Sequence, residues 1–160
     1  MSPSLILADD HPLILNGTKT YLENLGYNVI GTALDGQKAY NKIVQLKPDI
    51  ALLDYDMPKL NGIEIAEEVK RNKLHCKIII LTLHKQVSLI KEVGKTIHGY
   101  ITKDSALEEF ETCIATILKG ESYIGSKLDK SIPFAIEKNT RLNLTKAEKK
   151  NTKPFKPKFK

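Results

Sequence analysis

The sequence lacks long hydrophobic runs and contains very little cysteine. No stretch approaches the roughly 18 consecutive apolar residues of a membrane-spanning helix. Asp9 and Asp10 interrupt the N-terminal region in which a signal peptide carries its apolar core. We therefore expect a soluble, cytoplasmic protein that does not bind a membrane. The two cysteines, Cys76 and Cys113, have neither a CxxC nor a metal-ligand spacing, which predicts buried reduced thiols.

The positive charge of the chain is confined to one end. The net charge is +6, yet residues 1–130 contain 16 Lys and Arg against 17 Asp and Glu, which gives −1. Residues 131–160 contain 9 against 2, which gives +7. A near-neutral body argues against a nucleic-acid-binding surface on the body itself. With 160 residues, 41% of them hydrophobic, the chain is long enough for one compact domain and an additional segment.

Short apolar runs rich in β-branched residues alternate with helical patterns along most of the chain. Continuous apolar strands that alternate with helices predict a parallel sheet covered on both faces, which is a doubly wound α/β fold. We expect five strands, and the runs that predict them are Leu5 to Leu7, Val29 to Ile30, Ile50 to Leu53, Ile78 to Leu81 and Tyr100 to Ile101.

The helical patterns have recognisable ends and apolar faces. Residues 87–93 give the weakest and shortest of these patterns. The residues that mark helix ends are Pro12 and Gly26, then Gly36 and Pro48, then Asn61 or Gly62, and finally Ser105 as a cap. The predicted inward positions are Leu15, Leu22 and Leu25; Ala39, Ile43 and Leu46; Ile63, Ala66 and Val69; and Leu107, Phe110, Ile114 and Ile117.

Polar residues follow the apolar runs at the points where the predicted strands end. In parallel sheets, ligands bind beyond the carboxyl ends of the strands, where the strand order reverses. We therefore expect one small acidic site made by residues that are far apart in the sequence: Asp9, Asp10, Asp54, Thr82 and Lys103.

The three carboxylates predict a bound cation. Asp9, Asp10 and Asp54 would repel one another unless a positive charge neutralises them. Mg²⁺ fits best, because it prefers oxygen ligands and pairs with phosphate. Lys103 adds a fixed positive charge and Thr82 a hydroxyl donor, which are the groups needed to hold a phosphoryl group. The simpler alternative is that Asp9 or Asp10 only caps the first helix.

These residues resemble the receiver domains of two-component response regulators. The resemblance covers about residues 3–120, and Asp9, Asp54, Thr82 and Lys103 follow one another at spacings of 45, 28 and 21 residues. It implies the flavodoxin-like (βα)5 receiver fold. The matching motifs are Leu5 to Pro12, Pro48 to Pro58, Asn61 with Gly62, Ile80 to Thr82, and Gly99 to Lys103.

The resemblance also implies a mechanism. Asp54 would accept a phosphoryl group from a sensor histidine kinase as an acyl phosphate. Asp10, Asp54 and the main-chain carbonyl of Asp56 would bind Mg²⁺, and Asp9 would act through water or by orienting it. Lys103 would form an ion pair with Asp54 and then with the phosphoryl oxygens, and Thr82 would donate to the same oxygens. Tyr100 would turn inward behind Thr82 as part of a switch. The chain would be no enzyme beyond accepting and hydrolysing its own phosphoryl group.

The roles of two histidines, and the length of one loop, do not follow directly from the resemblance. His84 and Asp56 lie where they could tune hydrolysis, although a solvent-exposed loop is the preferred interpretation of His84. His11 is interpreted as a helix-start residue, because Mg²⁺ prefers oxygen ligands. Residues 93–100 are about two residues longer than the usual turn before the last strand, so the dimer geometry is not predicted.

The C-terminal part is similar to the start of a LuxR-type output domain. Leu118 to Tyr123 resembles the end of a receiver, and Leu144 to Glu148 resembles the first turn of a helix-turn-helix domain. We divide the chain into a receiver over 1–120, a linker over 121–143 and a basic tail over 144–160. The tail is too short for a recognition helix with a core behind it. Truncation is preferred over a native disordered arm.

Three functions remain open at this point. The first is a receiver that controls promoter DNA binding through a full-length output domain, with phosphorylation-dependent homodimerisation. The second is a stand-alone receiver or phosphorelay module that acts through protein contacts. The third is a phosphatase of the haloacid-dehalogenase type, suggested by Asp54 and Asp56, which is disfavoured because the acid pair precedes this motif.

Overall fold

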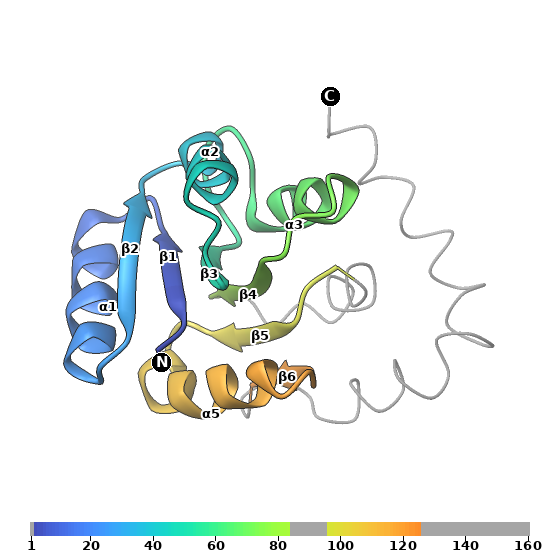
Figure 1. Cartoon of the computed structure of the whole chain (residues 1–160). Helices are drawn as coiled ribbons and strands as arrows, with labels where there is room; N and C mark the ends of the chain where they lie inside the picture. Colours follow the sequence, from blue (N-terminus) through green and yellow to red (C-terminus); the bar gives the residue numbers. More distant parts are fainter. Residues whose placement is uncertain (1, 84–95, 126–160) are drawn as a thin grey trace, which may run out of the picture.

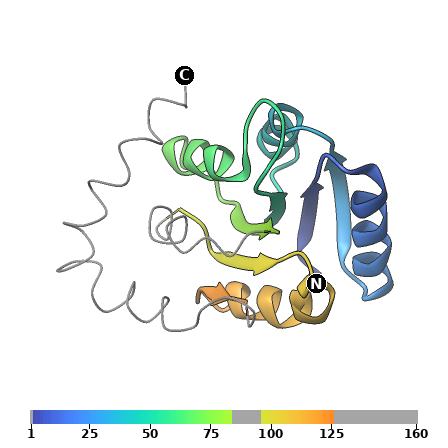
Figure 2. The same ribbon diagram turned by 180° about the vertical axis from the view of Figure 1, so that it is seen from behind.

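The computed structural model describes residues 2–83 and 96–125 and consists of a parallel sheet between two layers of helices (Figures 1 and 2). The strand order is β2-β1-β3-β4-β5-β6, so the order reverses between β1 and β3. The strands are β1 (Ser4–Ala8), β2 (Asn28–Ala33), β3 (Ile50–Asp54), β4 (Lys77–Thr82), β5 (Gly99–Thr102) and β6 (Tyr123–Ile124). The helices are α1 (Pro12–Asn24), α2 (Gly36–Leu46), α3 (Gly62–Arg71) and α5 (Ala106–Leu118).

The alternation of side chains along each strand builds a separate core on each face of the sheet. In β1, Ile6 and Ala8 pack with α2 and α3, whereas Leu5 and Leu7 pack with α1 and α5. Figure 1 shows α2 and α3 on one side of the sheet and α1 and α5 on the other. The doubly wound α/β prediction is therefore confirmed.

The predicted number of strands was one too low. β6 pairs in parallel with β5, with Tyr123 opposite Gly99 and Ile124 opposite Tyr100. A strand of two residues gives no periodic signal in a sequence, and it lies in the segment that we predicted to be a linker. The tyrosine hydroxyl of Tyr123 donates to Glu109 Oε1 at 2.7 Å, which ties β6 to α5.

Most of the predicted helix ends and inward positions agree with the structure. Asn61 is the N-cap of α3 and forms a capping box with Glu64. Ser105 occupies the N-cap position of α5 but makes no capping hydrogen bond, because its hydroxyl pairs with Thr102 Oγ1 at 2.9 Å.

Three predicted core positions were wrong. Leu25, Leu46 and Leu107 are 37%, 40% and 50% exposed. Leu25 is the C-cap of α1, and Leu46 is the last residue of α2 and lies beside Gly31 of the edge strand β2. In α5 the buried stripe begins one residue earlier, at Ala106, so Leu107 points away from the sheet.

Several predictions fall outside the described residues. They are the helix over 87–93, the loop position of His84, the first part of the longer loop, and the tail over 144–160. Cys76 and Cys113 are buried and free, as expected. Within residues 2–83 and 96–125, none of the helices has the length and apolar character needed to cross a bilayer.

Candidate functional site

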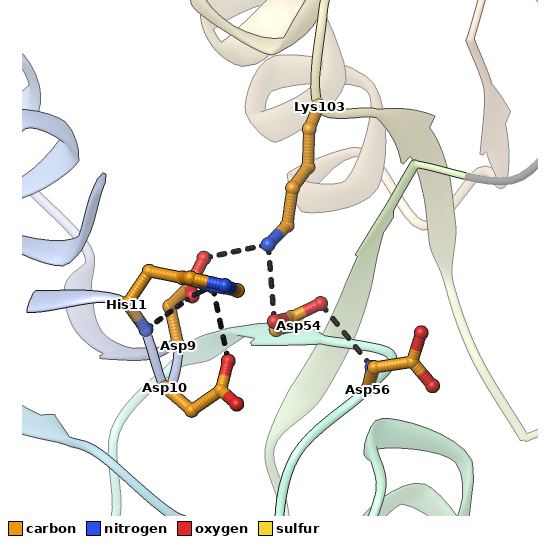
Figure 3. Close-up of polar contacts among 6 residues, drawn as sticks. All are labelled: Asp9, Asp10, His11, Asp54, Asp56 and Lys103. Carbon is orange, nitrogen blue, oxygen red and sulfur yellow. Dashed lines mark hydrogen bonds and ion pairs between the residues drawn. The ribbon is translucent and has the colours of Figure 1, made fainter. Parts of the chain in front are cut away.

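The residues predicted to form a site lie at the carboxyl edge of the sheet, beside the reversal of strand order. Asp9 and Asp10 directly follow β1, Asp54 is the last residue of β3, and Lys103 directly follows β5. Figure 3 shows the Lys103 side chain reaching to the carboxylates of Asp9 and Asp54 from the end of β5. The structure thus brings together four residues that the sequence separates by up to 94 positions.

Lys103 bridges two buried carboxylates. Its Nζ donates to Asp9 Oδ2 at 2.9 Å and lies 3.0 Å from Asp54 Oδ2 (Figure 3). The Lys103 side chain is 9% exposed and both carboxyl groups are 4% exposed. We predicted the pair with Asp54, but sequence reasoning missed the pair with Asp9. The main-chain nitrogen of Lys103 donates to the Thr82 carbonyl at 2.8 Å, which fixes where the lysine side chain starts.

His11 contacts both acids that precede it. It is the N-cap residue of α1, so it does start the helix. Its Nδ1 lies 3.0 Å from Asp9 Oδ1 and 3.1 Å from Asp10 Oδ1, and its main-chain nitrogen donates to Asp9 Oδ1 at 2.9 Å. Neither Asp9 nor Asp10 is the helix N-cap, and the simple capping alternative was therefore wrong.

The electrostatic environment shifts the pKa values of the two buried acids, Asp9 and Asp54, in opposite directions. Burial, together with the nearby charge of Asp9, raises the pKa of Asp54 to about 6, although Lys103 opposes the rise. Burial also favours the neutral form of Asp9, but hydrogen bonds from Lys103 and His11 outweigh it and hold the Asp9 pKa below its usual value. Burial disfavours the charged form of Lys103, and the two carboxylates reverse this and raise its pKa.

The carboxyl groups have the donor set and the spacing of a cation site. Asp9, Asp10, His11 and Asp54 each present a ligand atom, and these atoms lie within 4.8 Å of one another. Among the described residues, Asp10 Oδ1 and Asp54 Oδ2 are buried without a hydrogen bond, although His11 and Lys103 lie at ion-pair distance. Carboxylate oxygens are the ligands that Mg²⁺ prefers, so these residues fit that ion.

The loop after β3 is positioned by main-chain contacts. The main-chain nitrogen of Asp56 donates to Asp54 Oδ1 at 3.2 Å. Gly62 approaches the Asp54 carbonyl so closely that a Cβ at Gly62 would lie 2.9 Å from that oxygen and 2.8 Å from Ile80 Cδ1. A residue without a side chain is therefore required at the start of α3, because it packs directly on the end of β3.

Thr82 and Tyr100 lie beside the acids, within the sheet. Thr82 ends β4 and is 1% exposed, and Tyr100 in β5 is fully buried. Burial, reinforced by Tyr55, raises the pKa of Tyr100 to about 12, and the neighbouring Thr82 hydroxyl opposes the rise. The aromatic ring of Tyr100 thus already occupies an inward position.

Comparisons with known proteins identify the family of this chain. Residues 5–115 match the family model described as the response regulator receiver domain. One curated relative, the uncharacterized transcriptional regulatory protein YvfU of Bacillus subtilis (strain 168), is 30% identical over 126 residues, which are 78% of this chain and 63% of the relative. The chain therefore spans less than two thirds of that relative.

Solved structures of regulators share the fold. A two-component response regulator of the LuxR family from Aurantimonas sp. SI85-9A1 has a TM-score of 0.77 at 27% identity, over 83% of this chain and 96% of that chain. A structure described as two RcsB dimers bound to two parallel DNAs has a TM-score of 0.72 at 26% identity, over 86% and 69% of the two chains. No feature of the described site favours the phosphatase alternative over these matches.

Proposed function

The chain belongs to the response regulator receiver domain family, and on this premise we propose that Asp54 is its phosphoacceptor. An oxygen of the Asp54 carboxylate forms a bond to phosphorus while the bond from phosphorus to a histidine nitrogen of the sensor kinase breaks. The departing imidazole takes the electron pair of that bond. The observation that carries the proposal is the ammonium of Lys103, held 2.9 Å from Asp9 and 3.0 Å from Asp54.

The remaining site residues have supporting roles in this proposal. Lys103 offsets negative charge that develops on the phosphoryl oxygens, and Thr82 donates a hydrogen bond to them. Asp10, Asp54 and the main-chain carbonyl of Asp56 would hold Mg²⁺, and Asp9 would act through water or by orienting the ion. When bound, the ion screens the charge between the carboxylate and the incoming phosphoryl group. Tyr100 packs behind Thr82 and responds to its position.

In this proposal the only molecule that is chemically changed, besides the phosphodonor, is the receiver domain. The domain accepts one phosphoryl group and later loses it to water, because acyl phosphates hydrolyse. It has no separate substrate that it turns over.

Free, buried cysteines fit a reducing compartment such as the cytoplasm, which is where we place this reaction.

The relatives of this chain are response regulators of the LuxR and NarL type. We propose that phosphorylation of the full-length protein promotes homodimerisation and binding of promoter DNA through an output domain. The support comes from a similar protein, RcsB, whose solved structure is described as two dimers bound to two parallel DNAs. No observation favours a stand-alone relay module. A gel shift with a full-length protein, with and without phosphodonor, tests the output.

Intact mass after incubation with Mg²⁺ and acetyl phosphate tests the phosphoacceptor. We expect a labile gain of one phosphoryl group, roughly 80 Da, which is lost in Asp54→Asn. The matched control is Asp56→Asn, which retains the main-chain carbonyl and should still form the adduct. An adduct that persists in Asp54→Asn, or no adduct on the wild-type protein with any phosphodonor, would contradict the proposal.

A further inference from the structure

A cavity of about 850 Å³ lies at the edge of the sheet opposite the carboxylates. It is bounded by residues that precede or begin β3, β4 and β5 and by the C-terminal end of α3. Its volume is within the range of roughly 300–1,000 Å³ that small-molecule sites occupy. Lys77 and Thr82 are the first and last residues of β4, so the cavity and the site of Asp54 are separated by the length of that strand.

The cavity is lined by cationic groups that have no anionic partner. Lys70 lies in the last turn of α3, Lys73 lies two residues beyond that helix, and Lys77 begins β4. Within the described residues, none of these three lysines forms an ion pair. The carboxylate in the described lining, Asp49, is already engaged, because Ser4 donates to it from its main-chain nitrogen at 2.8 Å and from its hydroxyl at 3.2 Å.

His98 adds a hydrogen-bond donor to this lining. Its Nδ1 accepts the main-chain N–H of Ile78 at 3.0 Å, so the proton of the neutral ring resides on Nε2. No acceptor for that N–H occurs in the described part of the chain. Lys77 lines the same cavity as His98. Burial, and then the charge of Lys77, lowers the pKa of His98.

We propose that this cavity binds a small multivalent oxyanion of the diphosphate class. Three ammonium groups and the Nε2–H of His98 would donate to its oxygens, and these three lysines outnumber Asp49, the one carboxylate in the described lining. Cations at a helix C-terminus also stabilise the helix dipole. That explanation covers Lys70 in the last turn of α3 and Lys73 just beyond it, but it leaves Lys77 on a strand and His98 before β5 unexplained.

Amide chemical shifts of the whole chain, titrated with inorganic diphosphate in EDTA, test the proposal. Saturable shifts are expected at the amides of Lys77, Ile78 and Gly99, whereas the amides of Asp56 and Lys103 should not move. Chloride at matched ionic strength should produce none of these shifts. A parallel titration with ADP distinguishes the two sources of the anion, since tighter binding of ADP indicates a nucleotide and weaker binding indicates the inorganic ion.

Variants of the lining lysines test whether diphosphate binds in this cavity. Lys77→Gln should weaken diphosphate binding about tenfold, because one charge-assisted hydrogen bond is lost. The control Lys38→Gln removes an exposed lysine of α2 and should leave the affinity unchanged. Lys70→Gln is exposed and provides the same test if Lys77→Gln fails to fold. Shifts that spread over the lysine-rich residues 131–160, or an affinity that neither cavity variant changes, would overturn the proposal.

Discussion

The ammonium of Lys103 lies 3.0 Å from Asp54 Oδ2, and less than one tenth of either side chain is exposed. The same nitrogen donates to Asp9. One cation therefore compensates two buried acids that arrive from different strands. Removing Lys103 takes the ammonium from both carboxyl groups and leaves Asp9 with its contacts to His11. Adding a divalent cation would instead supply positive charge to both acids. The first two predictions follow from this arrangement.

Lys103→Met should destabilise the metal-free protein by about 3 kcal/mol or more, because a buried ion pair loses one partner. Urea unfolding measures the loss, and saturating Mg²⁺ should restore part of it by binding only the folded state. The control is Lys59→Met, where an exposed lysine lies 4.0 Å from Asp35. Its effect should remain within about 0.5 kcal/mol. Equal losses in the two variants would show that Lys103 is not a structural bridge.

Asp54→Asn should stabilise the metal-free protein at neutral pH. The folded-state pKa of about 6 exceeds the ordinary 3.8, so folding favours protonated Asp54. The wild type therefore loses stability as pH rises between these values, by at most about 3 kcal/mol. Thermal unfolding in EDTA measures the difference. Mg²⁺ should raise the Tm of the wild type more than that of Asp54→Asn, and the opposite order would argue against a cation site.

His98 should make the fold sensitive to mild acid. Burial, followed by the charge of Lys77, lowers its pKa below the ordinary 6.5, so the unfolded chain takes up the proton first. Stability is therefore present above pH 6.5 and is lost as pH falls below it. His98→Asn retains an acceptor for the N–H of Ile78 and should flatten this dependence in urea unfolding. Exposed His75→Asn serves as the control, and an unchanged profile in His98→Asn would contradict the prediction.

Gly62→Ala should disturb the phosphoacceptor strand. The new methyl group would meet the Asp54 carbonyl at 2.9 Å and Ile80 Cδ1 at 2.8 Å, so the end of β3 must shift. We expect a loss of about 1 to 3 kcal/mol and a lower rate of phosphoryl adduct formation. Gly17→Ala is a matched control, because it has open space in α1 and should gain up to about 1 kcal/mol. A normal adduct rate in Gly62→Ala would mean that β3 tolerates the shift.

Tyr123→Phe should loosen β6 without unfolding the domain. The lost hydrogen bond to Glu109 is worth about 1 kcal/mol. Hydrogen exchange at the Gly125 amide, which donates to the Tyr100 carbonyl at 2.7 Å, should accelerate. The control Tyr40→Phe removes a bond of equal length to Asn72 on another part of the surface. Unchanged exchange at Gly125 would indicate that main-chain pairing alone holds β6.

The sequence predicted strand ends better than contacts. Asp54 and Lys103 were placed correctly because each follows a continuous apolar run, and parallel topology then brings such ends together. The bond from Lys103 to Asp9 was not predictable, because it depends on how a long flexible side chain reaches between strands. The contacts of His11 with Asp9 and Asp10 had one available signal, namely its position directly after them.

Two errors have local causes. Leu107 looked like a core residue because leucine at that spacing usually faces inward, yet the small Ala106 takes the place beside the sheet. β6 could not be predicted from the sequence, because a strand of two residues is too short to show the alternation of apolar and polar residues. The division into a receiver, linker and tail, and the roles of individual residues in phosphoryl transfer, remain predictions.

The position of β6 bears on how this domain is to be transplanted. A chimera that joins a foreign module after residue 120, the boundary predicted from sequence, would lack β6. The edge of β5 would then expose its main-chain N–H and C=O groups. Such an edge invites pairing between molecules. Fusion after Gly125 keeps the pairing of Tyr123 and Ile124 with β5. Chimeras built at the two junctions should therefore differ in solubility even if their acceptor sites are identical.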